Sequence, residues 1–207
     1  MRILYVTTIS NTVNAFLVPH IRMLINYGHQ VDVAFNLVQE VHPELVRLGC
    51  KVHNVKFQRS VFKRENIAAY KEIKKIVRKE KYDLVHTHTP IASFLTRLAC
   101  KNIPGLKIFY TAHGFHFFQG SPLKNWLLYY SAEKISANWT NVLITMNEED
   151  YKNAKRIMNM KGEVYKVNGV GIDLSKFYPQ TKESKNKLRM EYGYTSDDFI
   201  LINVGEL

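Results

Sequence analysis

Short apolar runs alternate with helical patterns along most of this chain, and this alternation constrains the fold more than any other feature. The runs contain few polar residues, which is typical of strands whose two faces are both covered in a parallel sheet. The helical patterns between them supply the crossover connections that parallel strands require. The sequence therefore predicts an α/β fold, in which an open parallel sheet carries helices on both faces.

The expected elements can be placed by residue number. We expect strands at Arg2–Thr7, Gln30–Phe35, Cys50–Val55, Tyr82–His86, Leu106–Thr111, Asn141–Thr145 and Glu163–Val167. We expect helices at Asn11–Tyr27, Glu40–Leu48, Glu65–Lys79, Ile91–Lys101, Leu123–Asn138 and Glu148–Met158. In the helix over 65–79, the side chains expected to face the core are Ile67, Ala68, Ile73, Ile76 and Val77. This order of elements predicts a Rossmann-like sheet.

The alternation stops near residue 173, where lysines become frequent and Pro179 occurs. We assign residues 1–173 to one Rossmann-like domain and residues 174–198 to a connector that contains a helix at Glu183–Tyr192. Residues 199–207 form another apolar run, which we interpret as the first strand of a second sheet.

The formal net charge of +11 favours an anionic partner. Basic residues concentrate in two neighbouring segments, which contain Lys56, Arg59, Lys63, Arg64, Lys71, Lys74, Lys75, Arg78 and Lys79. A solvated helix face is the simplest interpretation of such a run, and an anionic membrane surface is the alternative. We expect no nucleic-acid partner, because no signature of a nucleic-acid-binding module accompanies the charge.

No segment approaches the roughly 20 apolar residues that a membrane-spanning helix needs. The start of the chain also lacks the pattern of a signal peptide, so we expect a cytoplasmic protein. Cys50 and Cys100 form neither a disulfide framework nor a metal-binding spacing, and we expect both to be reduced.

Histidines stand where two predicted strands give way to loops. His86 and His88 are two residues apart, so they face the same side of an extended segment. In the next such loop, His113 is followed by Gly114 and His116. An open α/β sheet places its ligand groups at this edge. Structural hydrogen bonding, binding of a sugar or phosphate, and metal ligation are all open for these side chains, although no nearby Asp or Glu completes a metal site. For His113 we favour ligand contact, because Gly114 permits close approach of a ligand to the backbone.

Other candidate segments flank these loops. The loop after the first strand contains Thr8, Ser10 and Asn11 and lacks a glycine-rich nucleotide-binding motif. These residues suit a helix N-terminus that binds a polar group, and capping of the helix by Ser10 or Asn11 is the alternative. Large apolar residues gather between 115 and 130, where core packing or an exposed patch that meets lipid would explain them. The segment over 168–173 suits a hinge beside an interdomain cleft.

Five segments, taken in order, resemble the N-terminal domain of retaining GT-B glycosyltransferases of the group-four family, especially bacterial exopolysaccharide and capsule enzymes. The segments are residues 1–8, 82–90, 111–115, 168–173 and 201–207. The resemblance covers essentially the whole chain. Many relatives carry a Gly-Gly pair in the first loop, where this chain has Ser10 and Asn11.

The resemblance implies two Rossmann-like domains that face a cleft. Residues 1–173 would recognise the acceptor, and residues 199–207 would begin a C-terminal domain that binds the donor. By the same resemblance, His113 is the catalytic candidate, which contacts the donor sugar, and the backbone of Gly169–Gly171 lines the cleft. Together with the residues singled out above, the candidate substrate-binding set is Thr8, Ser10, Asn11, His86, His88, Gly114, His116, Asn168, Gly169, Val170 and Gly171.

The implied reaction transfers a sugar, with retention of its anomeric configuration, from a nucleotide sugar to a lipid-linked or polysaccharide acceptor. The nucleotide sugar is a co-substrate, and no metal or other cofactor is expected. We expect the protein to act at the inner face of the cell membrane, and we expect this chain alone to be inactive. Two other functions remain open: a non-catalytic module that binds membranes or anions, and a metal-dependent hydrolase that uses His86, His88, His113 and His116.

Overall fold

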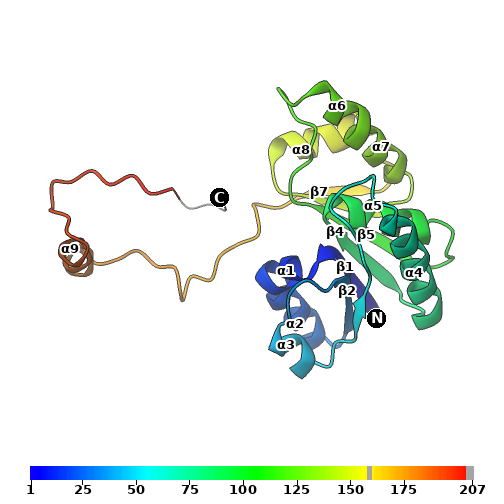
Figure 1. Cartoon of the computed structure of the whole chain (residues 1–207), viewed down its shortest axis with the longest axis horizontal. Coiled ribbons are helices and arrows are strands. Elements are labelled where there is room, and N and C mark those ends of the chain that lie inside the picture. The colour runs from blue at the N-terminus through cyan, green and yellow to red at the C-terminus, as the bar shows by residue number, and fades with distance from the viewer. Residues whose placement is uncertain (158–159, 204–207) are drawn as a thin grey trace. The chain divides into compact units, whose positions relative to one another are not determined.

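The computed structural model describes residues 1–157 and 160–203, and the chain divides into two compact units, Met1–Val170 and Gly171–Leu207. The first unit contains a seven-stranded sheet in the order β3-β2-β1-β4-β5-β6-β7 (Figure 1). Every neighbouring pair of strands in it is parallel. The predicted α/β class with an open parallel sheet is therefore confirmed.

The strands are β1 (Arg2–Ile9), β2 (Gln30–Asn36), β3 (Val52–Asn54), β4 (Leu84–His88), β5 (Lys107–Ala112), β6 (Val142–Thr145) and β7 (Glu163–Lys166). The α-helices are α1 (Ser10–Thr12), α2 (Val18–Asn26), α3 (Pro43–Arg47), α4 (Glu65–Glu80), α5 (Pro90–Cys100), α6 (Leu123–Asn125), α7 (Ser131–Ala137), α8 (Glu148–Lys152) and α9 (Lys182–Glu191). Three π-helical turns continue or join them: η1 (Val13–Leu17), η2 (Trp126–Tyr130) and η3 (Asn153–Ile157).

The strand order reverses beside β1. The chain builds β1, β2 and β3 outward in one direction, and then crosses back through α4 to place β4 on the other side of β1. In open α/β sheets, ligands bind outside the carboxyl ends of the strands at such a reversal. The topology therefore directs attention to the loops that follow β1 and β4.

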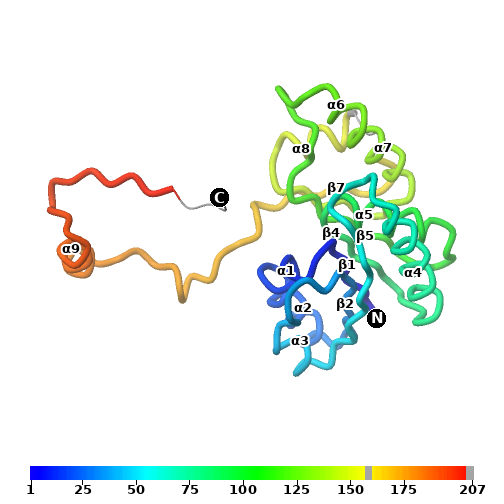
Figure 2. Tube along the Cα trace, in the orientation of Figure 1, coloured from blue at the N-terminus to red at the C-terminus, as the bar shows by residue number. Residues whose placement is uncertain are grey.

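Side chains of β1 alternate between two hydrophobic clusters. Ile3 and Tyr5 pack with η1, α2 and α3 on one face, whereas Leu4 and Val6 pack with α4 and α5 on the other. A third cluster joins β5 and β6 to the helical stretch that contains η2 and α7. Figure 2 shows α1–α3 together beside β1 and β2, and α4, α5 and α7 on the other side. Full burial of each such aliphatic side chain contributes about 1.5–3 kcal/mol, so β1 is held firmly at the centre.

The buried stripe of α4 differs from the prediction. Ile67 is exposed, as is Ala68, whereas Ile73, Ile76 and Val77 face the core as expected. Asn66 takes the inward position instead, because its side chain bonds the backbone of the preceding loop: Oδ1 accepts from Gln58 N, and Nδ2 donates to the carbonyl of residue 60. A buried polar side chain with both partners satisfied is tolerated in a core.

Both cysteines are buried and unpaired, as expected. The second unit, described by itself, contains α9, which begins where the Thr181 hydroxyl accepts a hydrogen bond from Ser184 N at 3.2 Å. The strand expected at its end is not tested. Residues 199–203 have no assigned secondary structure, and residues 204–207 lie outside the described residues. A strand needs a neighbouring strand to bond with, and this unit supplies none among its described residues.

Candidate functional site

Hydrogen bonds join the carboxyl end of β1 to the residue that follows β4. The backbone N–H of Thr8 donates to Thr89 Oγ1 at 3.0 Å, and the two hydroxyl oxygens lie 2.8 Å apart. Thr89 has a φ of 65°. That region is strained for a β-branched residue, and such strain concentrates at active and binding sites. The strained turn stands at the point where the strand order reverses.

A cavity of about 250 Å³ opens at this turn. Its lining includes Thr8, Thr12, Arg59, His116 and Tyr129. Arg59 is exposed and provides the positive charge of this lining. None of the described residues that line the cavity is acidic. Hydroxyl groups and a guanidinium together suit an oxyanion or a sugar.

A second cavity, of about 230 Å³, adjoins the first and is almost wholly apolar. Pro90, Ile91 and Tyr129 line both cavities. The remaining walls come from the loop before α4, from α5, and from the helical stretch of η2 and α7; they include Val61, Phe94, Leu95, Leu128 and Ala132. A polar cavity and an apolar cavity therefore share one wall.

Histidine rings from β4 and β5 stack beside this turn. The rings of His86 and His88 lie 4.4 Å apart on one side of β4, as the alternation predicts, and Tyr5 of β1 lies against both. His86 Nε2 is 2.8 Å from Thr111 Oγ1. His88 Nδ1 is hydrogen-bonded to His113 Nε2 at 3.1 Å. The rings thus run from the core towards the surface, where His113 is exposed.

Burial keeps these imidazoles neutral. Desolvation is the main cause that lowers the pKa of His86 to about 3, with smaller contributions from the charges of His20 and His113. It also lowers the pKa of His88 well below its usual value. The pKa of His113 is lowered too, by desolvation and then by His20. Neutral rings can each donate one hydrogen bond and accept another.

The loop that follows β5 is held by an acidic side chain of α8. Asp150 Oδ2 accepts a hydrogen bond from Phe115 N at 3.0 Å and another from Asn147 Nδ2 at 2.8 Å. A Cβ on Gly114, whose φ is 143°, would meet nothing within 4 Å. The backbone beside His113 is therefore open, and contact of a ligand with Gly114 stays a prediction.

Ser10 does not face a ligand. Its side chain is fully buried, and its hydroxyl donates to Gln39 O at 2.9 Å and accepts from Gln39 N at 2.9 Å. The hydroxyl therefore holds the loop after β2, and substrate contact by Ser10 stays a prediction that its burial does not favour. Capping by Ser10 or Asn11 is wrong, because Ile9 is the N-cap residue of α1 and no side chain caps it. Asn11 is exposed.

His88 needs a similar correction. Its side chain is 2% exposed, so it lies beneath His113 and does not reach a ligand directly. His116 is exposed and lines the polar cavity, with its ring 4.6 Å from that of Tyr129. Of the four histidines, His88 is buried, His86 is half-buried, and His113 and His116 are exposed.

The segment over 168–171 follows β7 and is exposed throughout. Gly169 and Gly171 have positive φ values of 77° and 75°, so this segment depends on glycine. The boundary between the two units falls after Val170, within this segment. Its expected place beside an interdomain cleft stays a prediction.

Part of the apolar stretch over 115–130 packs in the core, and part of it is exposed. Phe115 and Phe117 are buried and stacked with ring centroids 4.7 Å apart, whereas Phe118, Leu123 and Leu127 are exposed. Basic residues in the loop before α4, among them Arg59, Lys63 and Arg64, are exposed as well. Among the described residues, no helix combines the length and the apolar character needed to cross a membrane.

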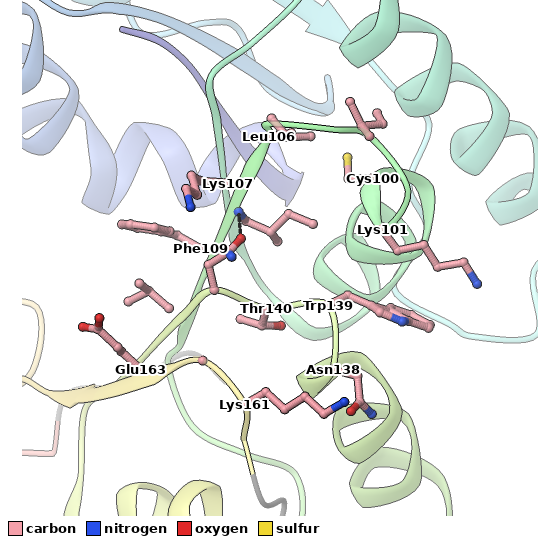
Figure 3. Close-up of a pocket in the computed structure, with 15 residues that line it drawn as sticks. Cys100, Lys101, Leu106, Lys107, Phe109, Asn138, Trp139, Thr140, Lys161 and Glu163 are labelled. Carbon is pink, nitrogen blue, oxygen red and sulfur yellow. Dashed lines mark hydrogen bonds between the residues drawn. The ribbon is translucent and has the colours of Figure 1, made fainter.

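A larger cavity than these two lies at the opposite, amino end of the strands. Figure 3 shows this space of about 630 Å³ between the starts of β5, β6 and β7 and the ends of α5 and α7. Lys101 lies 4.8 Å from the centroid of the Trp139 ring, and Lys107, Lys161 and Glu163 also line the space. The predicted site residues do not line it, so we assign the candidate site to the carboxyl end.

The histidines give no support to a metal centre. Within residues 1–157 and 160–203, no group of three or more His, Cys, Asp and Glu side chains is placed to hold a metal ion. His88 and His113 bond to each other through ring nitrogens, and the free nitrogen of His88 is buried. A hydrolase that needs converging imidazole ligands is therefore disfavoured.

Sequence reasoning missed some of the residues that form the site. The sequence indicates Arg59 only as part of a basic run and Tyr129 only as part of the apolar stretch over 115–130, and it does not single out Thr89. A signal for Thr89 existed, because it follows a predicted strand and precedes Pro90, where the backbone conformation is restricted. The position of Arg59 after β3, at the same end of the sheet, was the corresponding signal.

The family model and two curated relatives agree on one class. A family model described as glycosyl transferase 4-like matches residues 2–147. EpsD of Bacillus subtilis (strain 168), which carries the name of a glycosyltransferase, is 38% identical over 208 residues, and the match covers 100% of this chain and 53% of EpsD. The UDP-Gal:alpha-D-GlcNAc-diphosphoundecaprenol alpha-1,3-galactosyltransferase of Escherichia coli is 30% identical over 148 residues, which are 69% of this chain and 38% of that protein.

A solved structure supports the fold. Sucrose-phosphate synthase from Thermosynechococcus elongatus aligns with a TM-score of 0.67 at 13% identity, covering 95% of this chain and 53% of that one. The chain spans about half the length of EpsD, and less of the galactosyltransferase. Because the family model matches most of the chain, from the first strand to the sixth, this chain belongs to the glycosyl transferase 4-like family.

Proposed function

We propose that this chain forms the acceptor-binding part of a retaining glycosyltransferase whose acceptor is a sugar linked through a diphosphate to an isoprenoid lipid. The donor is a nucleotide sugar, which is a co-substrate, and no further cofactor is included. Two relatives support this class: EpsD by its name, and the galactosyltransferase by a name that specifies a UDP-sugar and a diphosphoundecaprenol-linked acceptor.

The single observation that favours this acceptor is the pair of adjoining cavities of opposite polarity. An amphiphile with an anionic head needs a cationic polar site next to an apolar one. Arg59 and the hydroxyl groups of Thr8 and Thr12 line the first cavity, and aliphatic and aromatic side chains line the second. Pro90, Ile91 and Tyr129 line both cavities, so the two adjoin, and one amphiphilic molecule would place its head in the first and its tail in the second.

Exposed apolar residues extend the second cavity towards solvent. Val61 and Leu128 line the cavity and are themselves exposed, and their neighbours Phe62 and Leu127 are exposed further, at 86% and 69%. Lys63 and Arg64, next to Phe62 in the sequence, are also exposed. An apolar surface with basic neighbours suits an anionic membrane, so we place the protein at the inner face of the cell membrane.

In the proposed reaction, a hydroxyl of the acceptor sugar attacks the anomeric carbon of the donor. The bond from that carbon to the donor diphosphate breaks, and the proton of the hydroxyl passes to an oxygen of the departing nucleoside diphosphate. His113, at the exposed end of the histidine stack, contacts the donor sugar, and the backbone of Gly169–Gly171 lines the same cleft. The donor nucleotide binds to the part of the protein that the relatives have and this chain does not span, so the chain alone is inactive.

Binding of isoprenoid diphosphates to the 207-residue chain tests the acceptor assignment. Farnesyl diphosphate, inorganic pyrophosphate and farnesol would be compared by calorimetry, with Ala132→Phe to fill the apolar cavity. Ala68→Phe, the same change at an exposed alanine of α4, is the matched control. We expect farnesyl diphosphate to bind more tightly than either fragment, and Ala132→Phe to reduce its affinity to that of pyrophosphate.

Two results would contradict binding of the lipid tail in the apolar cavity. One is equal affinity for farnesyl diphosphate and pyrophosphate, and the other is an equal effect of the two phenylalanine variants. The second measurement is sugar transfer by the full-length protein. If transfer requires a nucleotide sugar but proceeds equally well with water-soluble and lipid-linked acceptors, the protein is a glycosyltransferase and the lipid-linked acceptor is wrong. Absence of turnover with every nucleotide sugar would reject the proposed function.

A further inference from the structure

His88 and His113 form a hydrogen bond in which one ring must donate and the other accept. The atoms are Nδ1 of His88 and Nε2 of His113, 3.1 Å apart. A neutral imidazole has one N–H group and one bare nitrogen. Two proton arrangements are therefore available to the pair, and they differ in what His113 presents to the surface.

In the first arrangement, His88 carries its proton on Nδ1 and donates it to His113. His88 Nε2 is then bare, and His113 must carry its own proton on Nδ1. In the second arrangement, His113 donates from Nε2, and His88 carries its proton on Nε2. His113 Nδ1 is then bare and can only accept.

The surroundings of His88 Nε2 select between the two. This nitrogen is buried and has no hydrogen-bond partner among the described residues. An N–H group buried without an acceptor loses its hydrogen bond to water, and such orphaned donors are rarer in proteins than under-satisfied acceptors. The ring of His88 has little freedom to relieve this, since Tyr5, His86 and His113 all lie against it.

We propose that His88 is a positioning residue that fixes the tautomer of His113, so that His113 presents an Nδ1–H donor to an oxygen atom of the bound sugar. No described residue is hydrogen-bonded to Nδ1 of His113, and the ring is exposed. The buried, unpartnered Nε2 of His88 thereby determines which nitrogen of His113 carries the proton. Only the identity of the ligand rests on the proposed function.

The other rings of the stack support the orientation of His88 without setting its proton. His86 Nε2 is hydrogen-bonded to Thr111 Oγ1 at 2.8 Å, and its ring contacts that of His88 at a tilt of 32° with centroids 4.4 Å apart. Tyr5 stacks on His88 with ring centroids 5.4 Å apart. Because His86 has no hydrogen bond to His88 among the described contacts, its replacement should leave the tautomer of His113 unchanged.

Nitrogen–proton NMR of isotope-labelled histidines reads the tautomer directly and does not need turnover. In the wild-type chain we expect His113 to carry its proton on Nδ1 and His88 to carry its proton on Nδ1. In His88→Phe we expect His113 to revert towards the Nε2-protonated form, the commoner tautomer of a free imidazole side chain. His86→Phe, the same change on the same face of β4, is the matched control and should leave the Nδ1 proton in place.

His88→Asn keeps the test valid if the phenylalanine variant does not fold. An asparagine side-chain amide can place an N–H group near the position of His88 Nδ1, so we expect it to retain the Nδ1-protonated form of His113. In the full-length enzyme, loss of the hydrogen bond in His88→Phe should lower kcat/KM by roughly 10-fold to 100-fold, as for other hydrogen bonds that orient a functional histidine. His88→Asn should restore most of that loss.

Two results would overturn the proposal. One is an Nε2-protonated His113 in the wild-type chain. The other is a His88→Phe protein that is folded and keeps the Nδ1 proton on His113, whatever its activity. Failure of the proposed function is seen separately, as absence of transfer in a wild-type protein whose His113 still carries the Nδ1 proton.

Discussion

The two ends of the parallel sheet differ in what their cavities are made of. The amino end has the larger cavity, about 630 Å³ against about 250 Å³ and about 230 Å³ for the two at the carboxyl end. The carboxyl end has the strained Thr89, with a φ of 65°, and the buried, unpartnered Nε2 of His88. At the amino end, Lys81 also has a positive φ, of 54°, but it ends α4 in the ordinary left-handed conformation of a helix C-cap. Strain at a β-branched residue is costlier and concentrates at functional sites, so we assign the site to the smaller cavities.

The amino end is built for packing. A Cβ on Gly162 would lie 2.3 Å from Thr140 O, so the turn into β7 passes directly against the chain before β6. The side chain of Asn141 accepts a hydrogen bond from Ile108 N at 2.7 Å and ties the start of β5 to the same chain (Figure 3). Changes at this end should therefore alter stability, and changes at the carboxyl end should alter binding and turnover.

The largest expected effect follows from removal of His113. In the full-length enzyme, His113→Ala removes a hydrogen-bond donor to the sugar, and kcat/KM should fall roughly 100-fold to 1,000-fold. Lys161→Ala at the amino-end cavity is the control and should change kcat/KM by no more than about 2-fold. Steady-state kinetics measures both variants. An equal loss of activity in the lysine variant would contradict the assignment of the site to the carboxyl end of the sheet.

A smaller effect is expected for Arg59, which faces the polar cavity. Arg59→Gln removes charge-assisted hydrogen bonds to phosphate, so the affinity for inorganic pyrophosphate should fall roughly 10-fold to 100-fold. Arg64→Gln, an equal change of charge at an exposed residue that does not line the cavity, should have little effect. Calorimetric titration gives both values, and equal losses would show that net charge alone attracts the anion.

The converse test applies to the amino end. Gly162→Ala places a Cβ against backbone atoms, and forcing them apart should lower the free energy of unfolding by about 1–3 kcal/mol. Binding of farnesyl diphosphate should stay unchanged at temperatures where the variant is folded. Urea denaturation, with Lys161→Ala as the control, measures the loss. A variant as stable as the wild type would show that this turn is not tightly packed.

The smallest effect concerns pH. Burial holds the pKa of His86 near 3 in the folded chain, from a usual value of 6.5, so the unfolded chain binds a proton that the folded chain does not. Stability should be greatest above about pH 6.5 and fall as the pH is lowered, by about 1.4 kcal/mol per pH unit for each histidine kept neutral.

Urea denaturation at several pH values measures that slope. His86→Phe should reduce it by the contribution of one histidine, since phenylalanine does not titrate. An unchanged slope in this variant would mean that His86 is accessible to protons in the folded chain.

Much of the fold could be predicted because the signals are local. The apolar runs located all seven strands of the sheet, and alternation along β4 placed His86 and His88 on one side. The phase of α4 was wrong for Ile67 and Ala68, because Asn66 turns inward to bond the loop before it. Helical periodicity identifies a stripe, and the neighbouring loop decides its exact position.

The site was predicted less completely because its contacts are distant in sequence. Ser10 bonds Gln39 across 29 residues, which no local pattern indicates. The bond between His88 and His113 depends on the register that pairs His88 with Thr111 of β5. Residue types indicated which end of the sheet to consider, and only the packed structure showed which of those side chains remain free to bind.

Chemical-shift mapping of the 207-residue chain with farnesyl diphosphate shows directly which end of the sheet binds the ligand. We expect the largest shifts at Thr8, Arg59 and His116, smaller shifts along the apolar cavity at Ala132, and none at Gly162. Shifts concentrated around Gly162 at the amino end, or no shifts at a concentration that saturates a weak site, would contradict binding at the carboxyl end.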